Sequence, residues 1–122
     1  MKNYLFLVFL FYVFLSACTN DIGGKPKPIT SPCDTMTVLY STMIKPIVDA
    51  KCATVSGCHI SGSNGNGFDY TTYDGLKAEV DNGSLQKRVI DGDPTFMPPS
   101  GGLPKDEKQK FECWIKAKGP NN

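Results

Sequence analysis

Three residues that can do chemistry stand within one short stretch of the chain: Cys52, Cys58 and His59. His59 is the only histidine, and two more cysteines, Cys33 and Cys113, lie on either side of the group. Thiolate sulfur and imidazole nitrogen bind transition metals, and thiols also form covalent links to cofactors and to each other. The grouping therefore predicts a metal site, a covalently held cofactor or a set of disulfides.

The order of these residues favours one of these three kinds of site, the covalently held cofactor. Cys52 is followed, after five residues, by the adjacent pair Cys58-His59, and this order resembles the attachment motif of c-type haem. In that motif each thiol adds to a vinyl group of the haem as a thioether, and the adjacent histidine ligates the iron. The resemblance is to the cytochrome c family, and no second histidine competes with His59 for the role of proximal ligand.

Other parts of the chain extend the resemblance to small bacterial monohaem cytochromes c. Residues 44–52 look like the family's N-terminal helix, and residues 111–122 look like its closing helix and tail. The stretch Met97-Pro98-Pro99 is similar to the loop that presents the distal methionine. The resemblance implies an all-α, cytochrome c-like fold of three to five short helices around one covalent haem c. It also implies the ligands: Cys52 and Cys58 as thioethers, with His59 and Met97 as axial iron ligands.

The motif departs from the family in its spacing, because the usual two residues between the cysteines are replaced by five. On a helix, positions i and i+3 lie about 60° apart, whereas i and i+6 lie about 120° apart and further along the axis. Residues 53–57 therefore cannot be continuous helix if both thiols bond the haem. A variant with a single thioether at Cys58 stays open, although Cys52 ends its helix where the family's first cysteine stands.

Other interpretations of the same residues also stay open. The Cys-His group with one further cysteine has the ligand types of a zinc site. Four cysteines can also form two disulfides, in three pairings, in an exported binding or adhesion module without haem. Met97 has the alternative role of filling a gap in a small core. Met36 and Met43 are weaker candidates for the iron.

The resemblance also bears on the two cysteines that the haem would not use. Because the terminal helices of the family cross, it implies that Cys33, before the first helix, lies near Cys113 in the last one. Proteins outside the cytoplasm rarely keep two neighbouring thiols reduced, so we predict a Cys33–Cys113 disulfide. Two alternatives to this disulfide stay open. Cys113 could be reduced and buried, or, in the single-thioether variant, Cys33 could pair with Cys52.

The N-terminal segment resembles the signal of a bacterial lipoprotein. A charged start precedes an unbroken apolar run from Tyr4 to Leu15, which is shorter than the about 20 residues that span a bilayer. The run ends in Leu15-Ser16-Ala17-Cys18, which is similar to the lipobox, where the cysteine is lipidated and becomes the new N-terminus. An ordinary signal peptide, with Cys18 incidental, is the alternative.

These features predict the organisation of the chain. We expect a lipoprotein signal at residues 1–17, a flexible, lipidated tether at 18–32 and one domain at 33–122. The protein would be exported and anchored to a bacterial membrane, facing the periplasm or the cell exterior.

The apolar pattern of the domain predicts short helices and no convincing strand pair. Pro46 lies inside the first helical pattern, where it either kinks one helix or opens a second. The expected helices are residues 40–52, 73–81, 84–89 and 105–118. Ser41, Thr72 and Ser84 are the candidate N-caps of the first three helices, and Gly119 is the candidate stop of the last one.

Composition and charge bear on the class of function. All 12 Gly and 9 Pro follow the signal, and so loop-rich a domain has a small core that a cofactor or a disulfide must supplement. The chain has 13 basic and 12 acidic residues, and Lys2 falls in the signal, so the mature chain is neutral and lacks the broad basic field of a nucleic-acid binder. We therefore expect a one-electron carrier that meets redox protein partners, alone or as the haem subunit of a larger oxidoreductase complex. An enzyme is disfavoured because Met97 would fill the open iron position that substrate needs.

Overall fold

The structure is a computed structural model that describes residues 30–55, 58–62 and 67–122. The expected signal, Cys18 and most of the expected tether lie outside the described residues. All regular structure in the described ranges is helical, which confirms the prediction of an all-α class. No helix in these ranges is long and apolar enough to cross a membrane.

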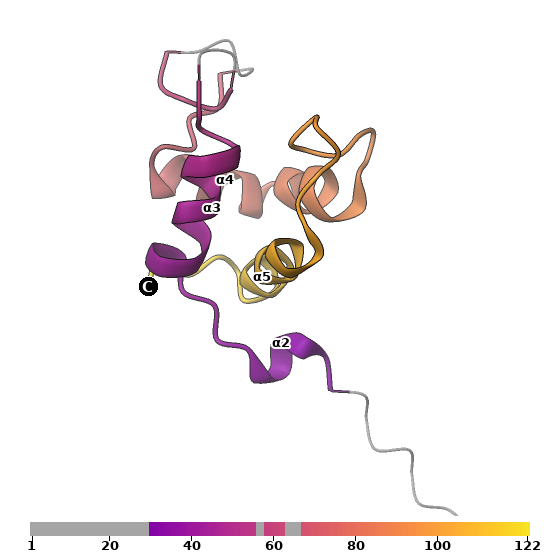
Figure 1. Ribbon diagram of the computed structural model, residues 1–122. Coiled ribbons are helices and arrows are strands. Elements are labelled where there is room, and N and C mark those ends of the chain that lie inside the picture. The colour runs from indigo at the N-terminus through magenta and orange to yellow at the C-terminus, as the bar shows by residue number, and fades with distance from the viewer. Residues whose placement is uncertain (1–29, 56–57, 63–66) are drawn as a thin grey trace, which may run out of the picture.

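The helices are short and are joined by long loops. In chain order they are α2 (Pro32–Thr35), the π-helix η2 (Tyr40–Ile44), α3 (Lys45–Lys51), α4 (Tyr73–Asp81), the π-helix η3 (Gln86–Asp91) and α5 (Lys105–Lys116). The C-terminal helix α5 packs against η2, η3 and α2 (Figure 1). The N- and C-terminal parts of the domain therefore meet at α5.

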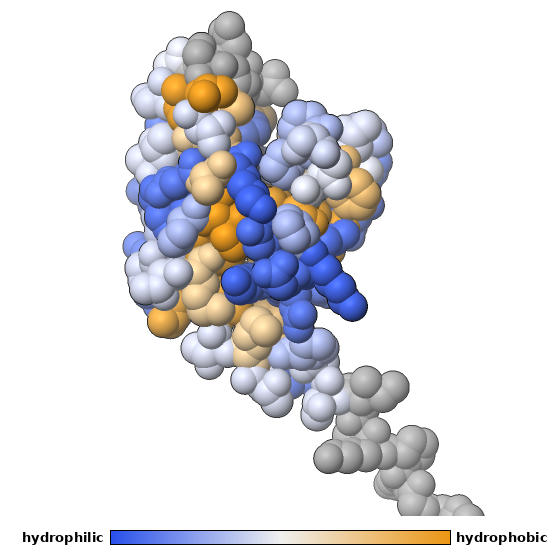
Figure 2. Space-filling view, in the orientation of Figure 1, coloured by the Kyte–Doolittle hydropathy of each residue, from blue (hydrophilic) through white to orange (hydrophobic). Residues whose placement is uncertain are grey.

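The core lies where α5 meets the N-terminal helices and α4. Its largest fully buried side chains are Trp114, Phe111, Ile44, Leu76 and Val48. Each such side chain contributes about 1.5–3 kcal/mol when it leaves water. The face in Figure 2 shows hydrophilic residues gathered over α5 and hydrophobic residues between α5 and α3.

Pro46 opens a second helix, which was one of the two expected outcomes. It stands in the first turn of α3, which follows η2 directly, so the change from π-helix to α-helix falls beside this proline. Ser41 is not the cap of the preceding helix, and that expectation was wrong. The N–H groups of Tyr40 and Ser41 instead donate to Asn122, to Oδ1 at 2.8 Å and to the backbone oxygen at 3.0 Å. The cap comes from the far end of the chain, where local pattern gives no sign of it.

The start and the end of α4 agree with the sequence. Thr72 Oγ1 accepts the N–H of Gly75 at 3.2 Å, and the helix ends at Asp81, before the left-handed Gly83. Ser84, by contrast, is not a side-chain cap. Its own N–H donates to Asn82 Oδ1 at 2.8 Å, in a turn before η3, and η3 has no side-chain cap.

The last helix, α5, ends at Lys116, two residues earlier than expected. Lys118 adopts a left-handed φ of 66°, and the indole N–H of Trp114 donates to the carbonyl of Pro120 at 3.0 Å. At the other end of the domain, Ser31 and Asp34 form a capping box around α2. Among the described residues, regular structure therefore begins at Pro32, the last residue of the segment that we expected to be a tether.

The predicted Cys33–Cys113 disulfide is present. The two Cα atoms lie 4.9 Å apart across a sequence separation of 80, within the range that a disulfide allows. The bond joins α2 to the middle of α5. It also rules out a reduced Cys113 and a pairing of Cys33 with Cys52.

Candidate functional site

A cavity of about 500 Å³ opens beside α3, α4 and η3. Its wall includes all four predicted haem and iron ligands: Cys52, Cys58, His59 and Met97. The structure thus brings Met97 to the Cys-His group from 38 positions away. The apolar part of the wall comes from Phe68, Tyr70, Leu85, Val89, Pro98 and Pro99, and the polar part comes from Lys51, Glu79, Ser84 and Arg88.

The extra residues of the motif form a loop that is closed at its base. Cys52 ends α3, and its N–H donates to the carbonyl of Val48 at 2.8 Å. The backbone then bends, and the N–H of His59 donates to the carbonyl of Cys52 at 3.0 Å. Residues 53–55 are not helical, as attachment of both thiols to one haem would require, and residues 56–57 lie outside the described ranges. The long spacing therefore still leaves Cys52 and His59 next to each other.

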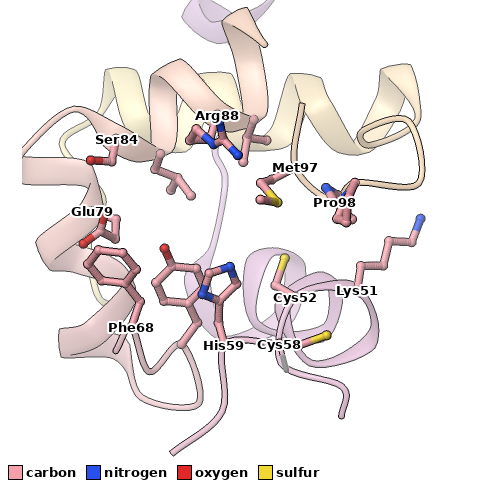
Figure 3. A pocket seen from close by; sticks show the side chains of 14 residues that line it. Lys51, Cys52, Cys58, His59, Phe68, Glu79, Ser84, Arg88, Met97 and Pro98 are labelled. Atoms are coloured by element: carbon pink, nitrogen blue, oxygen red, sulfur yellow. The ribbon is translucent and has the colours of Figure 1, made fainter. Parts of the chain in front are cut away.

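The side chains of the motif point in different directions (Figure 3). Cys52 and His59 extend toward the cavity, and Met97 faces them from the other side, whereas the sulfur of Cys58 points away from His59. Cys58 Sγ accepts a hydrogen bond from Thr54 Oγ1 at 3.5 Å. A thioether at Cys58 therefore requires its sulfur to turn toward the cavity by rotation of the side chain.

The two thiols of the site differ in acidity. Burial raises the pKa of Cys52 to about 11, and the neighbouring Cys58 and Glu107 act in the same direction. The hydrogen bonds from Thr54 and Val55 lower the pKa of Cys58. Thiolate, the reactive form, is therefore more abundant at Cys58 at any pH between neutrality and 10.

This difference predicts the order of alkylation in protein produced without haem. With a pKa of about 11, only about one Cys52 in a thousand is thiolate at pH 8. Iodoacetamide should modify Cys58 at least about tenfold faster, and peptide mapping over time measures both rates. The matched change Thr54→Val should slow Cys58 and leave Cys52 unaltered. Faster modification of Cys52 would contradict this description of the site.

The loop that carries Met97 is tied to two helices. The N–H of Met97 donates to the carbonyl of Arg88 in η3 at 2.8 Å. The ring of Phe96 lies under the ammonium group of Lys108 in α5, 4.6 Å from the ring centroid, in a cation–π contact. Phe96 also packs directly on Gly92, where an added Cβ would come within 2.6 Å of its ring. These contacts hold the backbone of Met97 beside the cavity.

The contribution of packing at Gly92 to stability can be measured separately from that of backbone strain, because Gly83 is a matched control. Both glycines have a left-handed φ, but a Cβ at Gly83 meets nothing within 4 Å. Gly83→Ala should cost only the strain, about 1–2 kcal/mol. Gly92→Ala should cost more in thermal or urea unfolding, because the ring of Phe96 must also move. Equal losses in the two variants would show that Phe96 does not anchor the loop.

The other methionines lie elsewhere in the domain. Met36 and Met43 are partly buried and pack against the hydrophobic core, and neither lines the cavity. Of the methionines in the described ranges, only Met97 therefore lines the cavity.

His59 is surrounded by aromatic side chains that follow it in the sequence. The ring of Tyr70 stacks on the imidazole, with centroids 4.2 Å apart and planes at 22°. Phe68 is more distant, with its centroid 6.4 Å from that of His59. Burial raises the pKa of the Tyr70 hydroxyl, and the carboxylate of Glu79 adds to the effect, so the hydroxyl stays protonated.

Sequence reasoning missed several residues of the cavity wall. Glu79 is 3% exposed and accepts a hydrogen bond from Asn82 Nδ2 at 3.1 Å. Arg88 brings a guanidinium group to the wall opposite His59 (Figure 3). Both lie on helices whose apolar residues were recognised, but a charged residue in a short helix normally faces water. No local signal marked Glu79, Arg88 or Tyr70 as part of the site.

The alternative of a zinc site finds little support in this geometry. In residues 30–55, 58–62 and 67–122, no group of three His, Cys, Asp or Glu side chains is placed to hold a metal ion. Cys52 forms no disulfide, which also speaks against a module stapled by two of them.

Comparisons with known proteins returned no relative of the chain: no family profile matches it, and neither a curated protein nor a solved structure matches significantly.

Proposed function

We propose that this protein is a lipid-anchored one-electron carrier that holds a single c-type haem in the cavity described above. The observation that carries the proposal is the convergence of Cys52, Cys58, His59 and Met97 on one largely apolar cavity. Its volume, about 500 Å³, lies in the range of sites for small molecules and cofactors, about 300–1,000 Å³.

The residues present fit a haem by the chemistry of their donor atoms. Cys52 and Cys58 supply thiols for thioether bonds, and an imidazole nitrogen and a thioether sulfur are common axial ligands of haem iron. Arg88 supplies a cation on the wall for the carboxylate groups that a haem carries, whereas Lys51 is paired with Glu107 at 2.7 Å. The aromatic and proline side chains of the wall suit the flat, apolar body of a porphyrin.

When bound, the haem supplies the one-electron chemistry of its iron. The chain's own residues decide how that chemistry is used. His59 and Met97 would both bind the haem iron, so no position would be left for a substrate and electron transfer would be favoured over catalysis. Met/His ligation raises the reduction potential, and an apolar wall raises it further because it disfavours the additional positive charge of the oxidised iron.

The proposed location is outside the cytoplasm, through the lipobox-like Cys18 and a tether. The Cys33–Cys113 disulfide supports this location, because such bonds persist in oxidising compartments. The partners would be redox proteins that donate and accept single electrons.

Replacing the distal ligand tests the proposal. In Met97→Ala the absorption band near the red end of the spectrum, typical of methionine sulfur on oxidised haem iron, should disappear. The reduction potential should fall, and added imidazole should bind to the vacated iron position. Optical spectra, redox titration and ligand titration of the haem-loaded protein measure these three effects.

Met43→Ala is the matched control, because Met43 packs against the core and does not line the cavity. The Met43→Ala protein should keep the absorption band and should not bind added imidazole. A band that survives in Met97→Ala, or one that is lost in Met43→Ala, would contradict the assignment of Met97.

A further inference from the structure

The orientation of the His59 ring is not determined by its own backbone. The torsion that rotates an imidazole ring about its Cβ–Cγ bond is broad and roughly two-fold, so neighbouring groups must select the plane of the ring. Around His59, the ring of Tyr70 is the neighbour that lies face to face with the imidazole, 4.2 Å away. Stacked aromatic pairs of this kind attract each other beyond the burial of their area.

Tyr70 is itself held in place from several sides. Its N–H donates to the carbonyl of His59 at 2.9 Å, which joins the two backbones beside the two rings. The preceding residue, Asp69, accepts hydrogen bonds from the N–H of Thr71 at 2.9 Å and from its hydroxyl at 2.5 Å. The first turn of α4 presses on the same segment, because a Cβ at Gly75 would stand 1.7 Å from the carbonyl oxygen of Asp69.

Phe68 does not have the same relation to His59. Its ring is 6.4 Å from the imidazole and tilted by 44°, and 41% of the residue is exposed. Tyr70 is 9% exposed, so its ring cannot swing into solvent without opening the core against which it packs. Of these two aromatic residues, Tyr70 has both the contact and the rigidity that are needed to fix a neighbouring ring.

We infer that Tyr70 is a positioning residue that sets the plane of the His59 imidazole and, through it, the orientation of the proximal ligand on the haem iron. This role rests on the proposed function, since it concerns His59 as an iron ligand. It belongs to the aromatic ring of Tyr70 and not to its hydroxyl. It therefore predicts that phenylalanine will replace tyrosine without effect and that an aliphatic residue will not.

The test uses the proton NMR spectrum of the oxidised, haem-loaded protein. The hyperfine shifts of the four haem methyl groups depend on the plane of the axial imidazole. Tyr70→Leu should reorder these four resonances or change their spread. Tyr70→Phe keeps the ring, and Tyr73→Leu removes an aromatic residue that does not line the cavity, so both should leave the wild-type pattern. The red-end band of methionine ligation should remain in all three variants, because Met97 is untouched.

An unaltered methyl pattern in Tyr70→Leu would overturn the inference and leave the proposed function standing. If Tyr70→Leu does not fold, the reduced wild-type protein still decides, because stacked rings must give nuclear Overhauser effects between Tyr70 and His59. Absence of these effects would overturn the inference. A wild-type protein without haem, or without hyperfine-shifted methyl signals, would overturn both the proposed function and the role of Tyr70 in ligand orientation.

Discussion

Cys33→Ser is expected to lower the free energy of unfolding by about 4 kcal/mol, which is about a thousandfold in the equilibrium constant. The loop that the disulfide closes spans 80 positions, and its cross-link removes a large part of the conformational freedom of the unfolded chain. Domains of this size are stable by only about 5–15 kcal/mol in total, so the variant should unfold at a much lower urea concentration. Urea titration of the haem-loaded proteins measures the difference.

Reduction of the wild-type protein is the control for this change. Cys33→Ser leaves Cys113 as a buried thiol, which packs like any small apolar side chain. A reductant should therefore bring the wild type to the stability of Cys33→Ser and leave the variant itself unaffected. An oxidised wild type that is no more stable than the variant would contradict the role assigned to the disulfide.

The double change Cys52→Ser with Cys58→Ser is expected to abolish covalent haem attachment completely. No thiol would then line the cavity, so any haem that remained would be extracted by acidified acetone. Each single change should leave one thioether and a haem that still resists extraction. Intact mass and the position of the reduced pyridine haemochrome band count the bonds in each variant.

Cys33→Ser serves as the control here as well, because it removes a cysteine remote from the cavity and should keep two thioethers. Because the spacing of the motif leaves one or two thioethers open, the single variants also show which thiol is bonded. If Cys52→Ser retained haem at full occupancy with an unchanged spectrum, attachment would rest on Cys58 alone. If Cys58→Ser behaved in this way, the sulfur that already faces the cavity, that of Cys52, would be the one that is bonded.

The parts of the fold that depend on nearby residues could be predicted from the sequence. The helix that starts after Thr72 has its capping oxygen, its apolar positions and its terminal glycine within twelve residues, and the structure agrees at both ends. The same holds for most of α5. The disulfide was predicted because the resemblance implied contact between the two ends of the domain, and that contact is present.

One prediction failed because a distant segment supplies what local chemistry also offers, and two others failed at local turns. Ser41 has the side chain of a cap, but Asn122 reaches the first N–H groups of η2 from the other end of the chain. At Ser84, the backbone N–H donates to the side chain of Asn82, two residues earlier, and no side chain caps η3. The end of α5 was placed two residues late because the left-handed conformation of Lys118 is uncommon for a residue with a side chain.

In the candidate site, too, some features could be predicted from the sequence and others could not. Its donor atoms could be named from the sequence because their chemistry is distinctive: the sole histidine, two nearby thiols and a methionine ahead of two prolines. The groups that orient these donors could not be named, since Tyr70, Arg88 and Phe96 are ordinary residue types whose roles arise from tertiary contacts. The directions of the two cysteine sulfurs also depend on how the loop between them closes.

The central claim is that this chain carries a covalent c-type haem, and one measurement tests it most directly. The full-length protein, matured in cells that contain the haem attachment machinery, is converted to its reduced pyridine haemochrome after extraction with acidified acetone. The proposal predicts that all the haem stays with the protein and that the band lies at the position for two thioethers. Protein without haem, or a band at the position of unmodified haem that leaves with the solvent, would contradict it.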